Sequence, residues 1–166
     1  MSWKESVTNL RLSDHSSVVW NDKLYVYGGE NEMSEINGQL YEMDLCDKNA
    51  SFQVKAAANL PCGRENHTSC VVSDKMWTFG GKNNRGCFNE LLEYDFINGH
   101  WLVHKDLPIS PRCCHSMVYW TAENMLIVYG GWNENDFYGD IWGISLNNKE
   151  KPQCVKIQAN RPYVSL

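Results

Sequence analysis

Histidine and cysteine are the side chains of this sequence best suited to chemistry, and they come close together at two places. His67 precedes Cys70 by three residues, and His115 directly follows Cys113 and Cys114. A tetrahedral zinc site needs four such ligands that converge on one ion. On an extended strand, residues one or three positions apart point to opposite faces. We therefore predict cysteines that are buried as small apolar side chains, with no metal site and no cofactor.

Enzymatic motifs are not visible in the chain. It holds no nucleophile elbow, no phosphate-binding glycine loop and no HExxH sequence. The histidines that start the apolar runs, His15, His67 and His115, recur after 52 and then 48 residues. A catalytic site is needed once, whereas a packing device is needed in every repeat. We therefore predict structural histidines and assign no catalytic residue.

Charge and hydropathy exclude several classes of function. The net charge is -5 and the sequence pI is about 5.5, with no Lys/Arg cluster, which disfavours nucleic-acid binding. No apolar run approaches the ~20 residues of a membrane span. The first residues lack the apolar core of a signal peptide, and the seven cysteines form no CxxC pair. These features predict a reducing compartment, the cytoplasm or alternatively the nucleus.

A repeat organises the whole chain. Its clearest marker is an aromatic residue followed by two glycines, and the first glycines lie 52 and then 50 residues apart. The three copies are Tyr27-Gly28-Gly29, Phe79-Gly80-Gly81 and Tyr129-Gly130-Gly131. Because the histidine marker keeps nearly the same period, we infer three tandem units.

Each unit contains four short apolar stretches of four to eight residues, rich in β-branched and aromatic side chains. Such lengths favour strands over helices and predict an all-β protein built from three four-stranded antiparallel blades. We place the blades at about 12–59, 60–108 and 109–160. Residues 1–5, which contain a tryptophan, are predicted to be the fourth strand of a preceding blade.

The middle unit resembles a kelch repeat. Gly80 and Gly81 are followed by Tyr94 and, after six intervening residues, by Trp101. The linker LPISPRCCH before the third unit is also similar to kelch linkers. The third unit departs from the pattern, with Trp142 where tyrosine is expected and Cys154 where tryptophan is expected. In the first unit Tyr41 matches, and Phe52 takes the place of the tryptophan. The resemblance implies a partial kelch-type propeller, residues 1–166, with a single domain.

Three blades are too few to close a ring, since propellers have four to eight. An open array would expose an apolar face at each end. The chain is then a fragment of a longer kelch protein, a short isoform or partial gene product, or one half of a six-blade ring completed by a second copy or by further blades.

Residues in the linkers between blades are candidates for partner binding. In kelch adaptors, similar loops hold partner peptides through arginine, serine, asparagine and tyrosine, and the resemblance points here to Arg64, Asn66 and Arg112. Arginine grips carboxylates with two parallel hydrogen bonds, so an acidic peptide partner is expected. The alternative is that both arginines pack and form salt bridges within the propeller, because they recur with the repeat.

The loops after the double glycines vary more between units. The second loop offers polar contacts through Asn83, Asn84 and Arg85. The third sets aromatic side chains among polar ones, as interface hot spots do; these are Trp132, Phe137 and Tyr138. Alternatively these rings tuck against the adjacent blade.

The function predicted from these features is a protein–protein interaction module, a substrate adaptor or scaffold that is not itself an enzyme. The alternative is a fragment of a kelch-type enzyme, such as an oxidase or a sugar epimerase, whose catalytic residues lie outside this chain.

Overall fold

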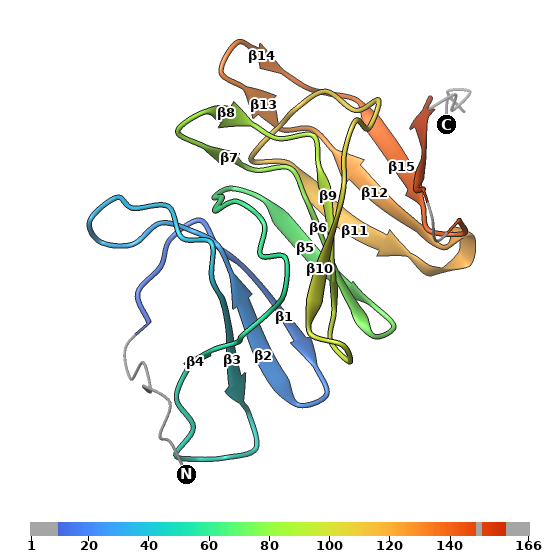
Figure 1. Ribbon diagram of the computed structural model, residues 1–166. Helices are drawn as coiled ribbons and strands as arrows, with labels where there is room; N and C mark the ends of the chain where they lie inside the picture. The colour runs from blue at the N-terminus through green and yellow to red at the C-terminus, as the bar shows by residue number, and fades with distance from the viewer. Residues whose placement is uncertain (1–9, 149–150, 159–166) are drawn as a thin grey trace, which may run out of the picture.

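The structure is a computed structural model that describes residues 10–148 and 151–158. Its main elements are three four-stranded antiparallel sheets, which we call blades A, B and C (Figure 1). Blade A consists of β1 (Ser16–Trp20), β2 (Lys23–Tyr27), β3 (Leu40–Asp44) and β4 (Gln53–Val54), hydrogen-bonded in that order. The all-β prediction is thereby confirmed.

Blades B and C repeat the same meander. Blade B consists of β5 (Thr68–Val72), β6 (Lys75–Phe79), β9 (Leu91–Asp95) and β10 (His100–His104). Blade C consists of β11 (Ser116–Trp120), β12 (Met125–Tyr129), β15 (Ile141–Ser145) and β16 (Gln153–Ile157), with one 3₁₀ turn, Thr121–Glu123, between β11 and β12. The predicted strand at 1–5 lies outside the described residues.

Two small hairpins extend blades B and C beyond the ends of their second strands. They are β7 (Lys82–Asn83) with β8 (Gly86–Cys87), and β13 (Trp132–Asn133) with β14 (Asp136–Phe137). Figure 1 shows the two hairpins side by side at the upper end of the molecule. Among the described residues no helix is long and apolar enough to cross a membrane.

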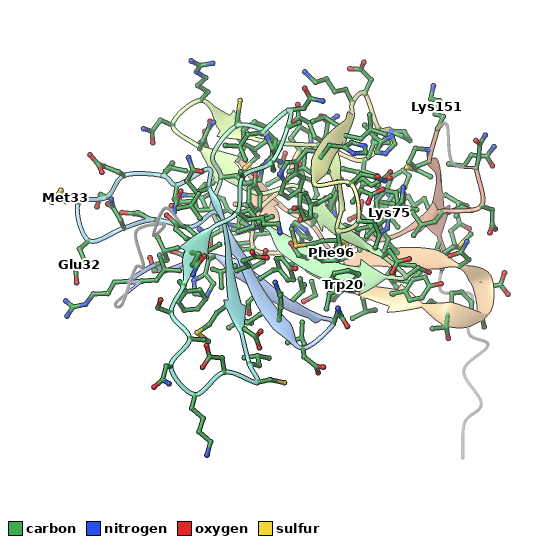
Figure 2. The ribbon with its side chains drawn as sticks, turned by 60° about the horizontal axis from the view of Figure 1, so that its bottom comes forward. Trp20, Glu32, Met33, Lys75, Phe96 and Lys151 are labelled. Carbon is green, nitrogen blue, oxygen red and sulfur yellow. The ribbon has the colours of Figure 1, made fainter. Side chains whose placement is uncertain are left out.

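The blades are arranged radially, with the first strand of each on the inside. Strand β5 contacts both β1 and β11, so the three inner strands lie in sequence order. Large aromatic side chains fill the wedges between sheets, because flat rings bury much area between two pleated surfaces. Between blades A and B, Trp20 stacks on Phe96 with ring centroids 4.6 Å apart (Figure 2).

The outer part of the same wedge is closed by the tyrosine and tryptophan that mark the middle repeat. Tyr94 and Trp101 are buried, with ring centroids 4.9 Å apart. Trp101 also lies 4.7 Å from the ring of Tyr27 in blade A. One repeat marker therefore packs against another across the blade interface.

In blades A and B the first glycine of the pair is needed because the next linker passes close by. Gly80 has φ +63°, and a Cβ added to it would lie 2.5 Å from the carbonyl oxygen of Arg112. Gly28 has φ +69°, and a Cβ there would lie 2.4 Å from the carbonyl oxygen of Arg64. Only glycine suits both the left-handed backbone and the close approach.

The repeated histidines join consecutive blades. The Nε2 atom of His67 lies 2.8 Å from the Ser16 hydroxyl, and that of His115 lies 2.8 Å from the Thr68 hydroxyl. Burial lowers the pKa of His67 to about 3 and that of His115 to about 4, so both rings are neutral at pH 7. The remaining repeat histidine, His15, directly precedes β1 and is exposed.

Candidate interaction surface

The linkers between blades and the loops after the double glycines meet on one surface, which we call the loop face. Backbone bridges join them: Ser13 pairs with Glu30, Glu65 with Lys82, and Cys113 with Trp132. Each first strand begins, and each second strand ends, at this surface. The residues proposed for partner binding all belong to these linkers and loops, and their exposure differs from one to the next.

The hairpin of blade B presents polar groups at its tip. Asn84 and Arg85 are exposed, and the Asn83 side-chain oxygen accepts a hydrogen bond from the Arg85 amide at 2.8 Å. Asn83 itself is half-buried, and its side-chain amide reaches the Gly63 carbonyl at 3.5 Å. The tip is thus ordered by Asn83, while Asn84 and Arg85 face solvent.

The hairpin of blade C presents an aromatic side chain. Phe137 is 90% exposed and stacks on the half-buried Trp132, with ring centroids 6.2 Å apart. Polar residues 134–136 form the tip beside it. Tyr138, the third aromatic candidate, is half-buried and lies with its ring centroid 4.3 Å from the Arg112 guanidinium carbon. Of the three rings, Phe137 is therefore the one most available to a partner.

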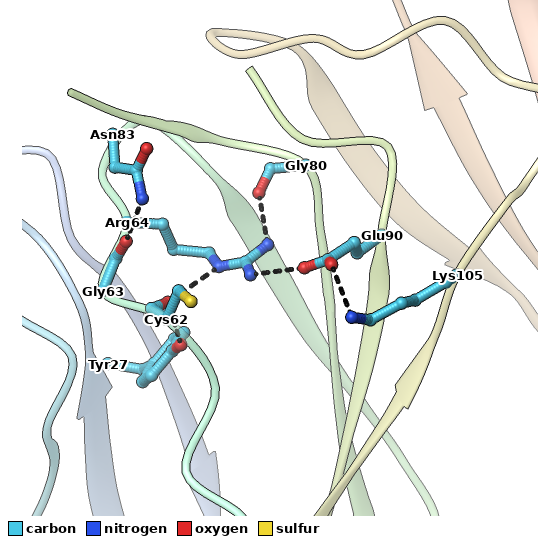
Figure 3. Close-up of polar contacts among 8 residues, drawn as sticks. All are labelled: Tyr27, Cys62, Gly63, Arg64, Gly80, Asn83, Glu90 and Lys105. Carbon is cyan, nitrogen blue, oxygen red and sulfur yellow. Dashed lines mark hydrogen bonds and ion pairs between the residues drawn. The ribbon is translucent and has the colours of Figure 1, made fainter. Parts of the chain in front are cut away.

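Arg64 lies inside blade B, with none of its surface exposed (Figure 3). Its guanidinium donates to the Gly80 carbonyl at 2.9 Å and to a Glu90 carboxylate oxygen at 2.9 Å. Its Nε donates to the Cys62 carbonyl at 3.4 Å, and the ring of Phe88 lies 4.1 Å from the guanidinium carbon. These contacts belong to the alternative that the arginine is structural.

Arg112 makes the same set of contacts in blade C. It is fully buried and donates to the Gly130 carbonyl at 3.0 Å and to Asp140 at 2.7 Å. Hydrogen bonding from Arg112 is the main reason that the pKa of Asp140 is lowered. In this arrangement neither guanidinium is available to a partner. The expectation of an acidic peptide, which depended on Arg64 and Arg112, therefore has no exposed cation from that pair to support it.

Blade A lacks this buried ion pair. Equivalent residues are identified by the backbone amide of the first glycine in each pair. The amide of Gly28 donates to the carbonyl of Gln39, that of Gly80 to Glu90 and that of Gly130 to Asp140. Where blades B and C have arginine, blade A has Leu12, and where they have a carboxylate it has Gln39. A hollow of about 430 Å³ lies there, lined among others by Leu12 and Asn37. This pattern was not predicted, although the sequence contains it: the arginine and the carboxylate are both present in blades B and C and both replaced in blade A.

The blade A part of the loop face is acidic. Asp14, Glu30 and Glu65 each bring one carboxylate oxygen within 4.8 Å of the others. Burial raises the pKa of Glu65, and hydrogen bonds from Ser34 and then Glu65 lower that of Glu30. The ammonium group of Lys82 lies 3.4 Å from Glu65 and offsets part of this charge.

Met33 and Glu32 extend this part of the surface outward, and the Glu32 carboxylate is paired with Arg11 at 2.6 Å. Both are exposed on the loop after β2, and Figure 2 shows them projecting from the body of the molecule. Asn66, the remaining linker candidate, is half-buried beside this surface; its amide donates to the Asp14 carbonyl at 2.8 Å.

The cysteines are less uniformly buried than the sequence indicated. Cys113 is buried, and burial raises the pKa of its thiol, but the adjacent Cys114 is exposed. Cys114 has φ 54°, which turns the chain at the inner end of the linker and directs this side chain outward. Cys46 and Cys62 are also exposed, because they lie in loops at the edge of the sheets.

Radial four-stranded blades joined by repeated contacts define the chain as part of a β-propeller. Residues 2–162 match the family model for the KLHDC2/KLHL20/DRC7 Kelch-repeats domain. The chain belongs to this kelch-repeat family, as the resemblance of its repeats predicted.

Solved and curated relatives are similar to most of this chain. It is 27% identical over 162 residues to the Leucine-zipper-like transcriptional regulator 1 homolog of Drosophila melanogaster, covering 92% of the chain and 16% of that relative. It is 34% identical over 125 residues to the N-(sulfonatooxy)prop-2-enimidothioate sulfolyase of Thlaspi arvense, covering 72% and 35%. The solved structure of YjhT has the same fold, with a TM-score of 0.70 and 16% identity, covering 94% of this chain and 54% of that one. The chain thus spans about a third or less of these two curated relatives.

Proposed function

We propose that this chain is an interaction module whose loop face holds a peptide or protein partner, as a substrate adaptor or scaffold would. Membership of the kelch-repeat family supports a protein-interaction module. The observation that carries the proposal is Phe137, which is 90% exposed on an ordered hairpin and backed by Trp132. A preformed aromatic side chain within a polar rim is the usual form of an interface hot spot.

The charges around Phe137 favour a partner that combines an apolar side chain with basic residues. Glu134 and Asp136 are exposed beside Phe137 on the same hairpin, and Glu35 is exposed on the loop of blade A, where exposed Glu32 is paired with Arg11 at 2.6 Å. On the same surface, exposed Arg85 is a basic exception. Complementary charge mainly speeds and orients association, while the aromatic anchor supplies affinity. We place this activity in the cytoplasm, where a reducing environment keeps thiols such as these free.

The test is quantitative affinity capture from a cytoplasmic extract with three forms of the chain: wild type, Phe137→Ser and Ile97→Ser. Ile97 is 67% exposed in the β9–β10 turn, away from the loop face, and serves as the matched control. Loss of a hot spot of about 2 kcal/mol weakens binding roughly 30-fold. We expect the Phe137 variant to lose one specific partner that the Ile97 variant retains. Equal capture by all three forms would remove the support for this surface.

An enzymatic role is the second candidate, because one relative is named as a sulfolyase. Its catalytic residues would then lie outside this chain, and the described blades would supply only scaffold. The test is to replace the matching blades of the Thlaspi arvense sulfolyase with this chain and to measure the sulfate released from N-(sulfonatooxy)prop-2-enimidothioate. A chimera that is more active than the sulfolyase lacking those blades would favour this second candidate over the interaction module.

A further inference from the structure

The two outermost blade faces of the described chain are apolar and uncovered. We call the side of a blade that faces the next blade its forward face, and the opposite side its backward face. Tyr27 and Phe79 occupy one position on the forward faces of blades A and B, and both are fully buried. Tyr129 occupies that position on blade C and is 55% exposed. Its neighbours Val118 and Trp120 are also exposed, so no described residue covers this forward face.

The backward face of blade A is the matching surface. Val19 and Leu45 are each about half exposed there, and Leu24, Tyr41 and Met43 are half-buried. Phe96 is the equivalent of Leu45 in blade B. The Leu45 amide donates to the Asp22 carbonyl in the β1–β2 turn, and the Phe96 amide donates to the Asp74 carbonyl in the β5–β6 turn. Phe96 packs against Trp20 of the blade before it. By the same geometry, Leu45 is placed to pack against a tryptophan in the position of Trp120.

Three polar contacts accompany the apolar packing at both interfaces within the chain. One joins a histidine ring to a hydroxyl of the preceding blade: His67 to Ser16, and His115 to Thr68, at 2.8 Å each. The other two are backbone hydrogen bonds across the interface. In the first, the amide of Gly29 donates to the Arg64 carbonyl (2.8 Å), as that of Gly81 does to Arg112 (2.9 Å). In the second, the amide of Asn66 donates to the Asp14 carbonyl (2.8 Å), as that of Cys114 does to Asn66 (2.9 Å).

On each of the two uncovered faces, one hydrogen-bonding group of every such contact is present, and its partner is missing among the described residues. The forward face of blade C carries the Ser116 hydroxyl, the Gly131 amide and the Cys114 carbonyl. The backward face of blade A carries the complementary groups of His15, Leu12 and Asp14. The contact at Leu12 uses only its carbonyl, so the replacement of arginine by leucine does not affect it. No described residue completes these half contacts.

We propose that a second copy of this chain covers both faces. The forward face of blade C in each copy packs against the backward face of blade A in the other, so that the contact forms twice and closes a ring of six blades. A head-to-tail contact that closes leaves no face uncovered. The size agrees, because the chain matches 54% of the YjhT chain, so that two copies would match about the length of one such chain.

Light scattering during size exclusion tests the pairing directly. The wild-type chain should elute at twice its 19.1 kDa mass. Tyr129→Arg, which blocks the forward face, and Leu24→Arg, which blocks the backward face, should each reduce the mass to that of one chain. A wild type that is monomeric at every concentration up to its solubility limit would overturn the proposal, even if it bound blades of another protein.

Mixing the two blocked variants distinguishes head-to-tail pairing from any other. Each variant keeps one intact face, so a one-to-one mixture should form a heterodimer through one normal interface. Pairing of identical faces would instead leave one of the two variants dimeric alone, which would contradict the proposal. Because a misfolded variant would not pair again on mixing, recovery also shows that both variants fold.

One further variant completes the design. Ile97→Arg, at an exposed apolar residue outside both faces, should remain dimeric. Phe137 is not used as such a control, because Cys87, its equivalent in the blade B hairpin, contacts the Trp132 carbonyl of blade C at 3.8 Å. Loss of the dimer is therefore measured with Leu24→Arg, which lies on blade A and leaves Phe137 unchanged.

Discussion

The buried arginine of each linker acts through the carboxylate that it contacts. Arg64 is fully buried, whereas Glu90 keeps about a fifth of its side chain exposed. Removing one partner of a buried pair is costly, because it leaves the other charge uncompensated. Partial exposure of Glu90 reduces that cost, and solvation discounts the ion pair itself.

We predict that Arg64→Ala lowers the free energy of unfolding by about 2–3 kcal/mol, from the lost hydrogen bonds and the space left behind. The double variant Arg64→Leu with Glu90→Gln reproduces the pair found in blade A, Leu12 with Gln39, and should recover part of the loss. Urea denaturation measures both. Arg85→Ala, at the exposed hairpin tip, is the control and should change stability by less than about 0.5 kcal/mol. A double variant less stable than the single would contradict this pairing.

The buried histidines make stability depend on pH. In the unfolded chain their pKa is about 6.5, whereas in the fold it is about 3 for His67 and about 4 for His115. Between pH 6.5 and about 4 the unfolded chain binds more protons, so stability falls as the pH falls through this range.

We predict a loss of up to about 1.4 kcal/mol per pH unit for each histidine across that range. His67→Gln should flatten the slope, whereas His100→Gln, at an exposed residue, should leave it unchanged. Chemical denaturation at a series of pH values measures the slope. An unchanged slope in the His67 variant would show that the ring is not buried as a neutral group.

At the scale of elements, the periodic markers made the three sheets predictable, because each marker is needed at every blade interface. Burial of Arg64 and Arg112 in salt bridges was one of two alternatives that their recurrence with the repeat allowed, but the partners Glu90 and Asp140, 26 and 28 residues further on, were not identified from the sequence. The hairpins β7–β8 and β13–β14 were also not predicted. Their strands have two residues each, too few to show an alternating pattern.

The double-glycine turn allows a prediction that compares two glycines. Gly80→Ala would place a Cβ 2.5 Å from the Arg112 carbonyl on a backbone with φ +63°. Gly86→Ala has φ +117° but meets no atom within 4 Å. Both variants carry backbone strain, and only the first must also separate blades B and C. Thermal unfolding should show a larger loss for Gly80→Ala, and equal losses would mean that the close approach is relieved at no cost.

At the scale of the whole molecule, the outer faces decide whether stability depends on concentration. If two copies close one ring, unfolding releases two chains, and mass action raises the midpoint temperature with protein concentration. The wild type should therefore show a midpoint that rises over a dilution series in calorimetry. Tyr129→Arg, which blocks pairing, should give one midpoint at all concentrations, close to that of the most dilute wild type. Ile97→Arg should behave as the wild type does, because its exposed side chain lies outside both faces. A concentration-independent midpoint in the wild type would mean that the open blades are stable with Tyr129 and Trp120 in contact with water.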